Sequence, residues 1–202
     1  GVMRTYASQE NAKQVKYIFR PTIQLGYRFN NYLSIRYKAY MGGYAPSLAE
    51  LSDVEQHIDI YQIRRGNPNL QAVRFFSNEL SISVGTKYIS AEWFTRYSYD
   101  DKPYMEETTY SNGFYVRSYA NQRGFHRLNS QINLKVQPWK DYMSIQLTPF
   151  VNRYISNGNT YTHTHTNWGL RANLMGMYKN WYVGANLETS FHSLWGETLN
   201  KD

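Results

Sequence analysis

The 202-residue chain has no cysteine, so no disulfide can staple it and no thiolate is available for catalysis or metal binding. It has no uninterrupted apolar run near the ~18 residues that a membrane-spanning helix needs, and its mean hydropathy is −0.65. No apolar signal-peptide core follows the opening residues Gly1-Val2-Met3-Arg4. These absences exclude a helical membrane protein, and they predict either a cytosolic protein or one whose beginning has been removed.

The composition is rich in aromatic side chains, at 17% with 20 Tyr and 5 Trp, and it is basic, with a net charge of +7. Amphipathic rings suit a boundary between water and lipid, and membrane barrels carry girdles of them. The cations are scattered singly and form no basic stripe or helix, so we expect no nucleic-acid partner. Composition alone leaves three classes open: a membrane barrel, a tyrosine-rich soluble sheet and a carbohydrate-binding surface.

The segment 124–150 alternates between apolar and polar residues on both sides of a turn at 138–141. Because successive side chains of a strand point to opposite faces, the pattern predicts a ribbon with one apolar and one polar face. Each arm is about 12 residues long, against a mode of about 5–6 in globular proteins. Long alternating strands joined by tight turns are typical of a membrane barrel, whose two faces meet lipid and water. The apolar positions include Leu128, Ile132, Leu134 and Val136 in the first arm and Met143, Ile145, Leu147, Pro149 and Val151 in the second.

The same alternation recurs along the chain and predicts eight strands. Pro21 lies inside the first of them and indicates an edge strand or a bulge, because proline donates no ladder hydrogen bond. Besides the two arms of the ribbon, the expected strands are 15–29, 33–39, 77–85, 88–99, 160–177 and 181–188.

The connections between these strands alternate in length. The turns near Asn30, Thr86, Pro138 and Lys179 are short, the connections at about 41–74 and 100–123 are long, and that at 155–160 is intermediate. Short turns therefore gather at one end of the strands, as they do in outer-membrane barrels. The predicted fold class is all-β: an antiparallel up-and-down meander of about eight long strands, part of a transmembrane β-barrel.

The two long connections carry local structure of their own. Ser47 and Glu50 have the spacing of a capping box and predict a short helix. The segment 58–63 predicts a short extra strand, and 104–119 predicts a ribbon around an Asn-Gly turn. Gly42-Gly43 and Pro46 are expected to end the preceding strand, and 193–197 is expected to be loop-like. Residues 1–14 are polar and carry no prediction.

The first long connection also holds the candidate ligand-binding residues Tyr61, Arg64, Arg65 and Arg74. Connections of this length tend to be functional. Arginine beside aromatic rings can recognise sugars, peptides or anionic chelates through stacking and forked hydrogen bonds. The competing and favoured interpretation is that this loop packs down with its own ion pairs.

His163 and His165 are the candidate metal ligands. Two residues apart in a strand, they point to the same face, and two imidazoles there could bind Zn, Cu or Ni. A metal site needs further ligands, and none is local. We therefore favour exposed polar strand residues and predict no metal and no cofactor.

Charged residues elsewhere favour structural roles over catalysis. The neighbouring acids Asp100-Asp101 and Glu106-Glu107 point to opposite sides of a strand, which is a poor geometry for paired-carboxylate chemistry, so we expect solvated loop charges. No nucleophile elbow, phosphate loop or zinc-protease motif is present, and we expect no enzyme. The polar-face cations Arg36, Lys38, Arg127 and Lys135 are expected to line a lumen or to pair across strands with Glu79, Glu92 and Glu188.

Two motifs carry a family resemblance. The segment Tyr44-Ala45-Pro46-Ser47-Leu48-Ala49-Glu50-Leu51, followed by Arg65-Gly66-Asn67-Pro68-Asn69-Leu70, resembles the barrel of TonB-dependent outer-membrane receptors in the form common in Bacteroidetes. Asn78-Glu79-Leu80 stands where that family places an acidic, Asn-rich run. The resemblance implies a place in the cell outer membrane and nutrient uptake, with energy relayed by TonB.

The resemblance also implies that 1–202 is a fragment of a single barrel domain. Receptors of this family have about 22 strands and a plug inside, whereas the chain has eight expected strands, no plug, no TonB-box segment and no terminal aromatic residue. The implied partners are outer-membrane lipid, the rest of the parent barrel and its plug, TonB through that plug, and an unidentified nutrient. Iron chelate, cobalamin, glycan and peptide all stay open, as do two alternatives: a soluble β-rich binding module with an aromatic surface, and a small stand-alone outer-membrane barrel.

Overall fold

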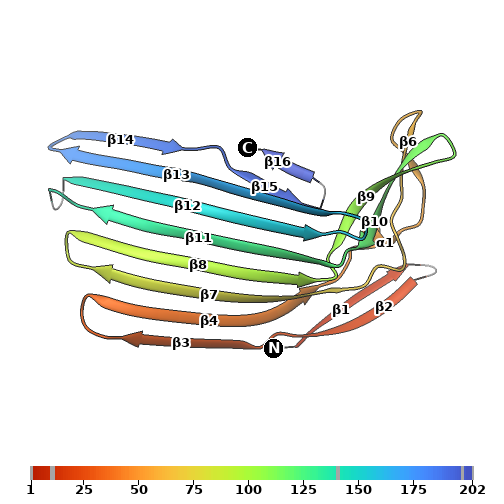
Figure 1. Cartoon of the computed structure of the whole chain (residues 1–202), viewed down its shortest axis with the longest axis horizontal. Coiled ribbons are helices and arrows are strands. Elements are labelled where there is room, and N and C mark those ends of the chain that lie inside the picture. The colour runs from red at the N-terminus through yellow and green to blue at the C-terminus, as the bar shows by residue number, and fades with distance from the viewer. Residues whose placement is uncertain (1, 10–11, 140–141, 197, 202) are drawn as a thin grey trace.

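The computed structural model describes the backbone of residues 2–9, 12–139, 142–196 and 198–201, and side chains from Phe19 onward. Its main body is an eight-stranded antiparallel sheet in the order β14-β13-β12-β11-β8-β7-β4-β3 (Figure 1). The strands are β3 (Thr22–Arg28), β4 (Leu33–Tyr44), β7 (Val73–Gly85), β8 (Ile89–Asp101), β11 (Gly124–Val136), β12 (Met143–Asn157), β13 (Thr162–Tyr178) and β14 (Trp181–Glu188). The predicted all-β meander of eight long strands is confirmed.

The edges of this sheet are β3 and β14. Within the described residues each has a single partner, so these eight strands do not close on one another, and a small stand-alone barrel does not fit the arrangement. Pro21 separates β3 from β2 (Ala12–Phe19), so the expected strand at 15–29 is two strands. The predicted edge strand is confirmed, because β3 lies at the edge of the sheet, whereas Pro21 separates two strands and the described residues show no bulge there.

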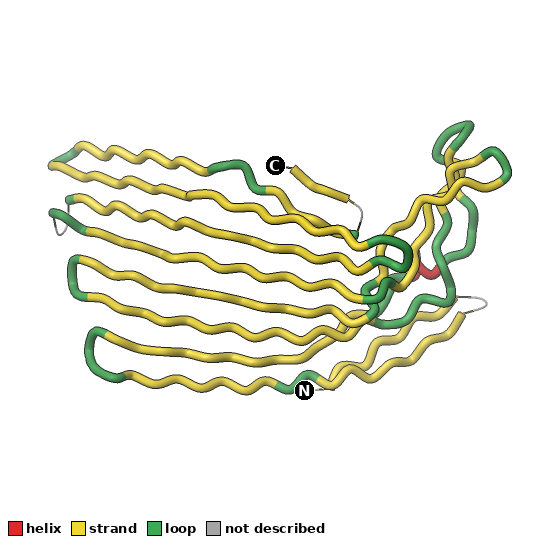
Figure 2. The backbone as a smooth tube through the Cα atoms, viewed as in Figure 1, coloured by secondary structure: helices red, strands yellow, loops and turns green. Residues whose placement is uncertain are grey.

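Short turns gather at one end of the sheet and long connections at the other (Figure 2). Asn30 shapes the first short turn, because its side-chain oxygen accepts hydrogen bonds from the amides of Tyr32 (2.8 Å) and Leu33 (2.9 Å). Lys179 begins the last one with a φ of 53°. Lys140 and Asp141, part of the expected turn at 138–141, lie outside the described residues. The predicted one-sided asymmetry of the turns is confirmed.

One face of the sheet, here called the apolar face, is built from the alternate positions that the sequence marks as apolar. Apolar residues lie opposite apolar residues of the neighbouring strands: Leu134 lies opposite Leu147 and Ala91, and Ile132 lies opposite Trp93. These side chains are exposed because no strand or helix of the described chain covers them. Exposed members of the face are Ile23, Leu25, Val84, Ile89, Trp93, Leu128, Ile132, Leu147, Val151, Trp168, Val183 and Leu187. A soluble domain rarely shows so large an apolar surface.

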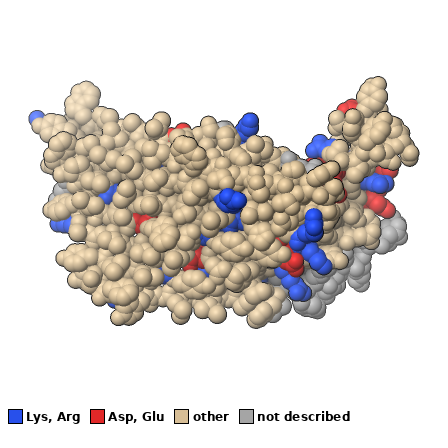
Figure 3. Space-filling view, viewed as in Figure 1, with Lys and Arg blue, Asp and Glu red and all other residues tan. Residues whose placement is uncertain are grey.

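The opposite, polar face is held by ion pairs between neighbouring strands. Arg36 pairs with Glu92 at 3.2 Å, and Glu79 accepts both Arg96 at 2.7 Å and Lys38 at 4.0 Å. The expected cross-strand pairing is thus confirmed for Arg36 and Lys38. Arg127 and Glu188 have partners other than those expected. Arg127 pairs with Asp100 at 2.9 Å, and Glu188 pairs with Arg171 at 2.9 Å. On the surface shown in Figure 3 the charges of both signs are scattered among uncharged residues.

Asp100 corrects a sequence prediction. It was expected to be a solvated loop charge, yet its side chain is 1% exposed. The register places it on the polar face of β8, opposite Phe75 and Phe125. Arg127 donates to both of its carboxylate oxygens, at 2.9 and 3.1 Å, which is how a buried carboxylate is tolerated.

Both ends of the described chain hold hairpins that the sequence did not predict. β1 (Val2–Gln9) pairs with β2 in a segment that carries no prediction. β15 (His192–Trp195) pairs with β16 (Thr198–Lys201) where a loop was expected, and Glu197 of that loop lies outside the described residues. Leu194 of β15 is buried against Met105, Phe125 and Tyr154, so the hairpin covers the polar face near the long connections. Such long-range packing leaves no periodic signal in a strand of four residues.

Of the residues expected to end this strand, Gly42-Gly43 lie within it, and β4 ends at Tyr44, just before Pro46. A Cβ on Gly42 would lie 2.5 Å from Cζ of Phe75, so glycine here leaves room for a neighbouring ring.

Among the described residues, no helix has the length and the apolar character needed to traverse a bilayer.

Candidate functional site

The two long connections fold together into one unit, here called the loop assembly (Figure 1). It comprises α1 (Leu48–Leu51), β5 (Gln56–His57), β6 (Gln62–Arg64), β9 (Tyr104–Ser111) and β10 (Phe114–Asn121). The four strands form a sheet in the order β5-β6-β10-β9, in which β6 from the first connection runs parallel to β10 from the second. The expected ribbon at 104–119 is confirmed, with its turn at Asn112 (φ 52°) and Gly113 (φ 86°).

The expected strand at 58–63 is shorter and displaced to Gln62–Arg64. Residues before it form the turn of the β5–β6 hairpin, because the amide of Ile58 bonds to the carbonyl of Gln62 at 2.9 Å and the amide of Tyr61 bonds to Oδ1 of Asp59 at 2.7 Å. An aspartate that accepts from its own backbone two residues on favours a turn over a strand.

Helix α1 is a single turn fixed at its start by the predicted capping box. Oγ of Ser47 accepts from the amide of Glu50 at 3.4 Å, and the amide of Ser47 donates to Oε2 of Glu50 at 2.6 Å. Leu51 then buries its side chain beneath the turn. The first recognised motif therefore has a local structural role, which is to begin and orient α1.

The second motif closes the other end of α1. The amide of Gly66 donates to the carbonyl of Ser52 at 2.6 Å, and the amide of Asn67 donates to the carbonyl of Glu50 at 2.7 Å. These bonds satisfy carbonyls that the end of a short helix leaves without partners. A Cβ at position 66 would lie 2.4 Å from the Glu50 carbonyl oxygen and 2.5 Å from that of Ser52, which explains the glycine.

Two asparagines then fasten the first connection to the second. Nδ2 of Asn67 donates to the carbonyl of Tyr119 at 2.9 Å. Asn121 bonds both backbone groups of Gln71, accepting from its amide at 2.8 Å and donating to its carbonyl at 3.1 Å. We call the bonds of Gly66, Asn67 and Asn121 the loop latch. Leu70 and Val73, which follow, are fully buried, so this part of the assembly has the packed character of a domain core.

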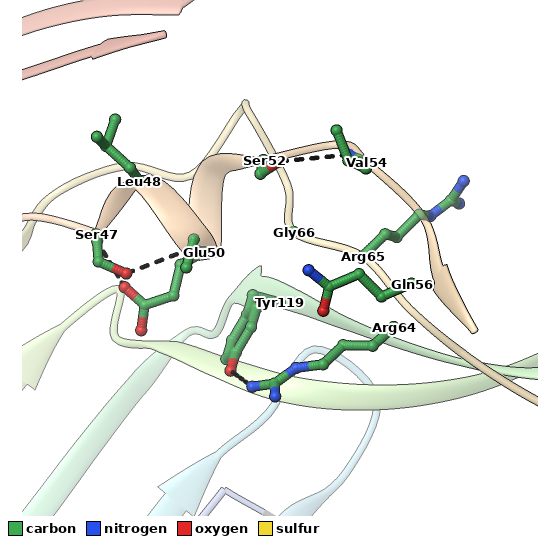
Figure 4. A pocket seen from close by; sticks show the side chains of 11 residues that line it. Ser47, Leu48, Glu50, Ser52, Val54, Gln56, Arg64, Arg65, Gly66 and Tyr119 are labelled. Atoms are coloured by element: carbon green, nitrogen blue, oxygen red, sulfur yellow. Dashed lines mark hydrogen bonds between the residues drawn. The ribbon is translucent and has the colours of Figure 1, made fainter. Parts of the chain in front are cut away.

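A pocket of about 540 Å³ opens between the two motifs and β10 (Figure 4). Nη2 of Arg64 donates to the hydroxyl of Tyr119 at 2.7 Å, and this bond raises the pKa of Arg64, which stays cationic. In Figure 4, Arg64 and Gln56 extend toward Tyr119, whereas Arg65 extends away from it. The lining comprises Ser47, Leu48, Ala49, Glu50, Ser52, Val54, Gln56, Arg64, Arg65, Gly66 and Tyr119. An exposed guanidinium beside hydroxyl and amide groups can bind a polar or anionic ligand.

The structure brings together two of the four candidate ligand residues. Arg64 and Arg65 line the pocket, and Arg65 also pairs with Glu55 at 3.6 Å, as the competing loop-packing interpretation expected. Tyr61 lies in the β5–β6 turn, and Arg74 lies on β7 opposite Gly43, so neither lines the pocket. Sequence reasoning missed Tyr119 because it reaches Arg64 through the parallel pairing of segments 55 residues apart. The capping box at Ser47 and Glu50 was recognised, although its place in a pocket wall was not.

His163 and His165 share one face of β13, as predicted, opposite Ser156 and Tyr154. They are half-buried and not exposed, because this is the polar face that β15 partly covers. The ring of His165 faces that of His192 on β15, with centroids 6.1 Å apart. In the part of the chain that the structure describes, no three His, Cys, Asp or Glu side chains gather as a metal site would require.

Comparisons with known proteins agree with the two-faced sheet. No curated protein gave a match to the chain. Among solved structures, the siderophore receptor PirA from Pseudomonas aeruginosa is similar, with 13% identity and a TM-score of 0.58 over 86% of this chain and 38% of that one. PirA from Acinetobacter baumannii follows with 9% identity and a TM-score of 0.48 over 87% and 37%. The first similarity shows a shared fold, and the chain spans less than two fifths of either receptor's length.

The family comparison covers almost the whole chain. Residues 3–200 match the family model described as "Outer membrane protein beta-barrel family". The apolar face, the polar face and the long connections at one end are features typical of transmembrane barrels of the outer membrane. The chain therefore belongs to the outer membrane protein β-barrel family, and its place is the cell outer membrane.

Proposed function

We propose that residues 1–202 form part of the wall and outer loops of a single barrel domain in a TonB-dependent receptor that imports a nutrient. The observation that carries this proposal is the opposition of the two faces of the sheet. An exposed apolar face fits lipid, and a polar face of cross-strand ion pairs such as Arg96–Glu79 fits a water-filled or plug-filled lumen. The fold shared with a siderophore receptor of more than twice the length supports a part of a larger barrel.

The sheet edges support the same proposal. β3 and β14 each present an unpaired backbone edge within the described residues, and such edges take up further strands when these are available. The remaining strands of the parent barrel would pair there. A plug inside that barrel would contact the polar face and relay energy from TonB, so motion resides in the plug and the wall has no catalytic role.

The pocket beside Arg64 is the proposed ligand contact. In outer-membrane barrels the longer loops face the outside of the cell, which places the loop assembly where a nutrient arrives. A guanidinium pairs well with carboxylate or phosphate groups, so among iron chelates, cobalamin, glycans and peptides the anionic members fit best.

Uptake measurements test the import function. Cells that lack the gene, cells that lack TonB and wild-type cells are each given labelled ferric chelates, cobalamin, oligosaccharides and peptides in turn. We expect the gene deletion and the TonB deletion to abolish uptake of the same compound. The proposal is wrong if uptake of every compound is equal in the three strains. It is also wrong if the gene deletion abolishes uptake of a compound and the TonB deletion does not.

Two arginine variants of the intact gene product test the ligand contact. Arg64→Ala removes the guanidinium from the pocket. We expect the imported compound to bind about tenfold more weakly, because one charge-assisted hydrogen bond is lost. Arg74→Ala is the matched control, because Arg74 lies outside the pocket on β7. Calorimetric titration measures both affinities. Equal affinities for the two variants would place the ligand elsewhere.

A further inference from the structure

The apolar face contains a groove at its short-turn end. Its volume is about 460 Å³, and apolar atoms make up almost all of its lining. Trp139 comes from the turn before β12, Leu174 and Tyr178 come from β13, and Trp181 and Val183 come from β14. None of these residues belongs to the loop assembly, which lies at the opposite end of the strands.

A glycine creates the floor of this groove. Gly176 lies on β13 between Met143 of β12 and Val183 of β14, on the apolar face. A Cβ built on Gly176 would have only the carbonyl oxygen of Tyr142 nearby, at 3.9 Å, so the space above the glycine is open. Leu174 and Tyr178, two positions away on either side, supply the walls of the groove.

The groove is continuous with the surface that faces the membrane. Its floor lies on the same face of the sheet as Leu147 and Leu134, and membership of an outer-membrane barrel family places this face against lipid. The exposed rings of Trp139 and Trp181 sit at the level where the strands end, and such rings mark the boundary between acyl chains and headgroups. An acyl chain suits this groove because it needs no hydrogen-bond partners.

A cation lies next to one of the residues that line the groove. Lys179 occupies the turn between β13 and β14, and its Nζ lies 5.4 Å from the ring centroid of Tyr178, which lines the groove. Lysine at a membrane boundary extends its ammonium group toward the headgroups while its stem stays on apolar surface. A phosphate at this position complements the charge.

We propose that this groove is a binding site for one phospholipid, with an acyl chain lying over Gly176 and the phosphate next to Lys179. Because the short turns of outer-membrane barrels face the periplasm, the lipid belongs to the inner leaflet. The proposal depends on the membrane location of the wall and is independent of the imported nutrient and of TonB.

Photolabelling of the intact gene product in nanodiscs tests the acyl-chain site. The probe is phosphatidylglycerol with a diazirine in one acyl chain, and peptide mass spectrometry maps the labelled residues. We expect label concentrated on 174–183 and at Met143. Gly176→Leu fills the groove and is expected to lower that label about tenfold, the effect of displacing roughly two methylenes.

Matched variants keep the test decisive. Ala172→Leu adds the same side chain to the same strand and face but outside the groove, two residues before Leu174, and should leave the label unchanged. Trp139→Ala removes one wall of the groove, and because Trp139 lies in an exposed turn, this variant should fold and should lower the label. Heat-modifiable gel mobility reports whether each variant, including Gly176→Leu, has folded. Label spread evenly over all outward-facing strands, or equal label in wild type, Gly176→Leu and Trp139→Ala, overturns the proposal.

A second probe tests the headgroup contact. Diacylglycerol with the same diazirine chain lacks the phosphate, so Lys179→Gln should lower labelling by phosphatidylglycerol and leave labelling by diacylglycerol unchanged. An equal response of the two probes to this substitution shows that Lys179 does not hold the phosphate.

Discussion

The barrel wall and the loop assembly place apolar side chains in opposite ways. In the wall, Trp168 is 78% exposed and Leu187 is 62% exposed, while Asp100 and Asn152 are buried on the other face. In the loop assembly and the chain leading from it, Leu51, Leu70 and Val73 are buried. The two regions are built for different solvents: lipid stabilises exposed apolar residues of the wall, and water drives the same residue types into the interior of the loops.

The difference predicts opposite sensitivities. Within the described residues, no strand or helix covers an outward-facing wall residue, so a change of volume matters little there and a charge matters greatly. In the loop assembly, the exposed positions tolerate charge, whereas a single added methyl group at a close backbone contact disrupts the packing. Three substitutions test this contrast, in order of decreasing expected effect.

The largest effect is expected at Arg127, where the wall meets the loop assembly. Arg127→Met leaves the carboxylate of Asp100 buried without its partner, and we expect the free energy of unfolding to fall by about 3–5 kcal/mol. Urea titration of the intact gene product in detergent measures it.

The control for this substitution is Arg171→Met, which breaks a pair whose members are 43% and 60% exposed and should cost no more than about 1 kcal/mol. The double variant Asp100→Asn/Arg127→Met should recover most of the loss. Equal costs at Arg127 and Arg171 would contradict the buried character of the first pair.

The second effect is expected in the middle of the apolar face. Ile132→Lys places a charge against lipid and should make folding into phospholipid vesicles less favourable by about 2–4 kcal/mol. Gln131→Lys adds the same charge to the polar face of the same strand and should be nearly neutral. If Gln131→Lys costs as much as Ile132→Lys, the assignment of the two faces is wrong.

The smallest of the three effects on the whole protein is expected in the loop latch. Gly66→Ala forces a methyl group against the carbonyls of Glu50 and Ser52, at a local cost of about 3 kcal/mol, and should open the loops without unfolding the wall. Limited proteolysis should cut within 45–72 and 102–123 faster, while heat-modifiable mobility stays unchanged.

Gly26→Ala is the control for the latch, because a Cβ there meets nothing closer than 3.7 Å. Cleavage rates that are the same for Gly66→Ala, Gly26→Ala and wild type would show that the latch does not hold the loops.

The wall could be predicted from the sequence because each strand repeats one rule. Along 124–150 the side-chain period alone gives the faces, and the register of Leu134 with Leu147 confirms them. The rule fails where a single contact outweighs the period. Gly42 stays in a strand because Phe75 needs its space, and Leu194 forms a strand because a distant cluster buries it.

The candidate site was predicted only in part. Arg64 and Arg65 stand beside a recognisable motif, so they could be found from sequence. Tyr119 could not, because it reaches the pocket through a parallel strand pair between two connections, and neither connection carries a sign of the other. Asp100 escaped for a similar reason: its burial depends on Arg127, which comes from a different strand.

The loop latch makes the two long connections a single cassette for exchange between related outer-membrane barrels. Transplanting 45–72 alone would leave the side chain of Asn67 and the backbone of Gln71 without the groups that Tyr119 and Asn121 supply. Transplanting 102–123 alone would break the same bonds from the other side. A chimaera intended to acquire new ligand selectivity should therefore receive both segments together, and evolutionary recombination is expected to respect the same boundary.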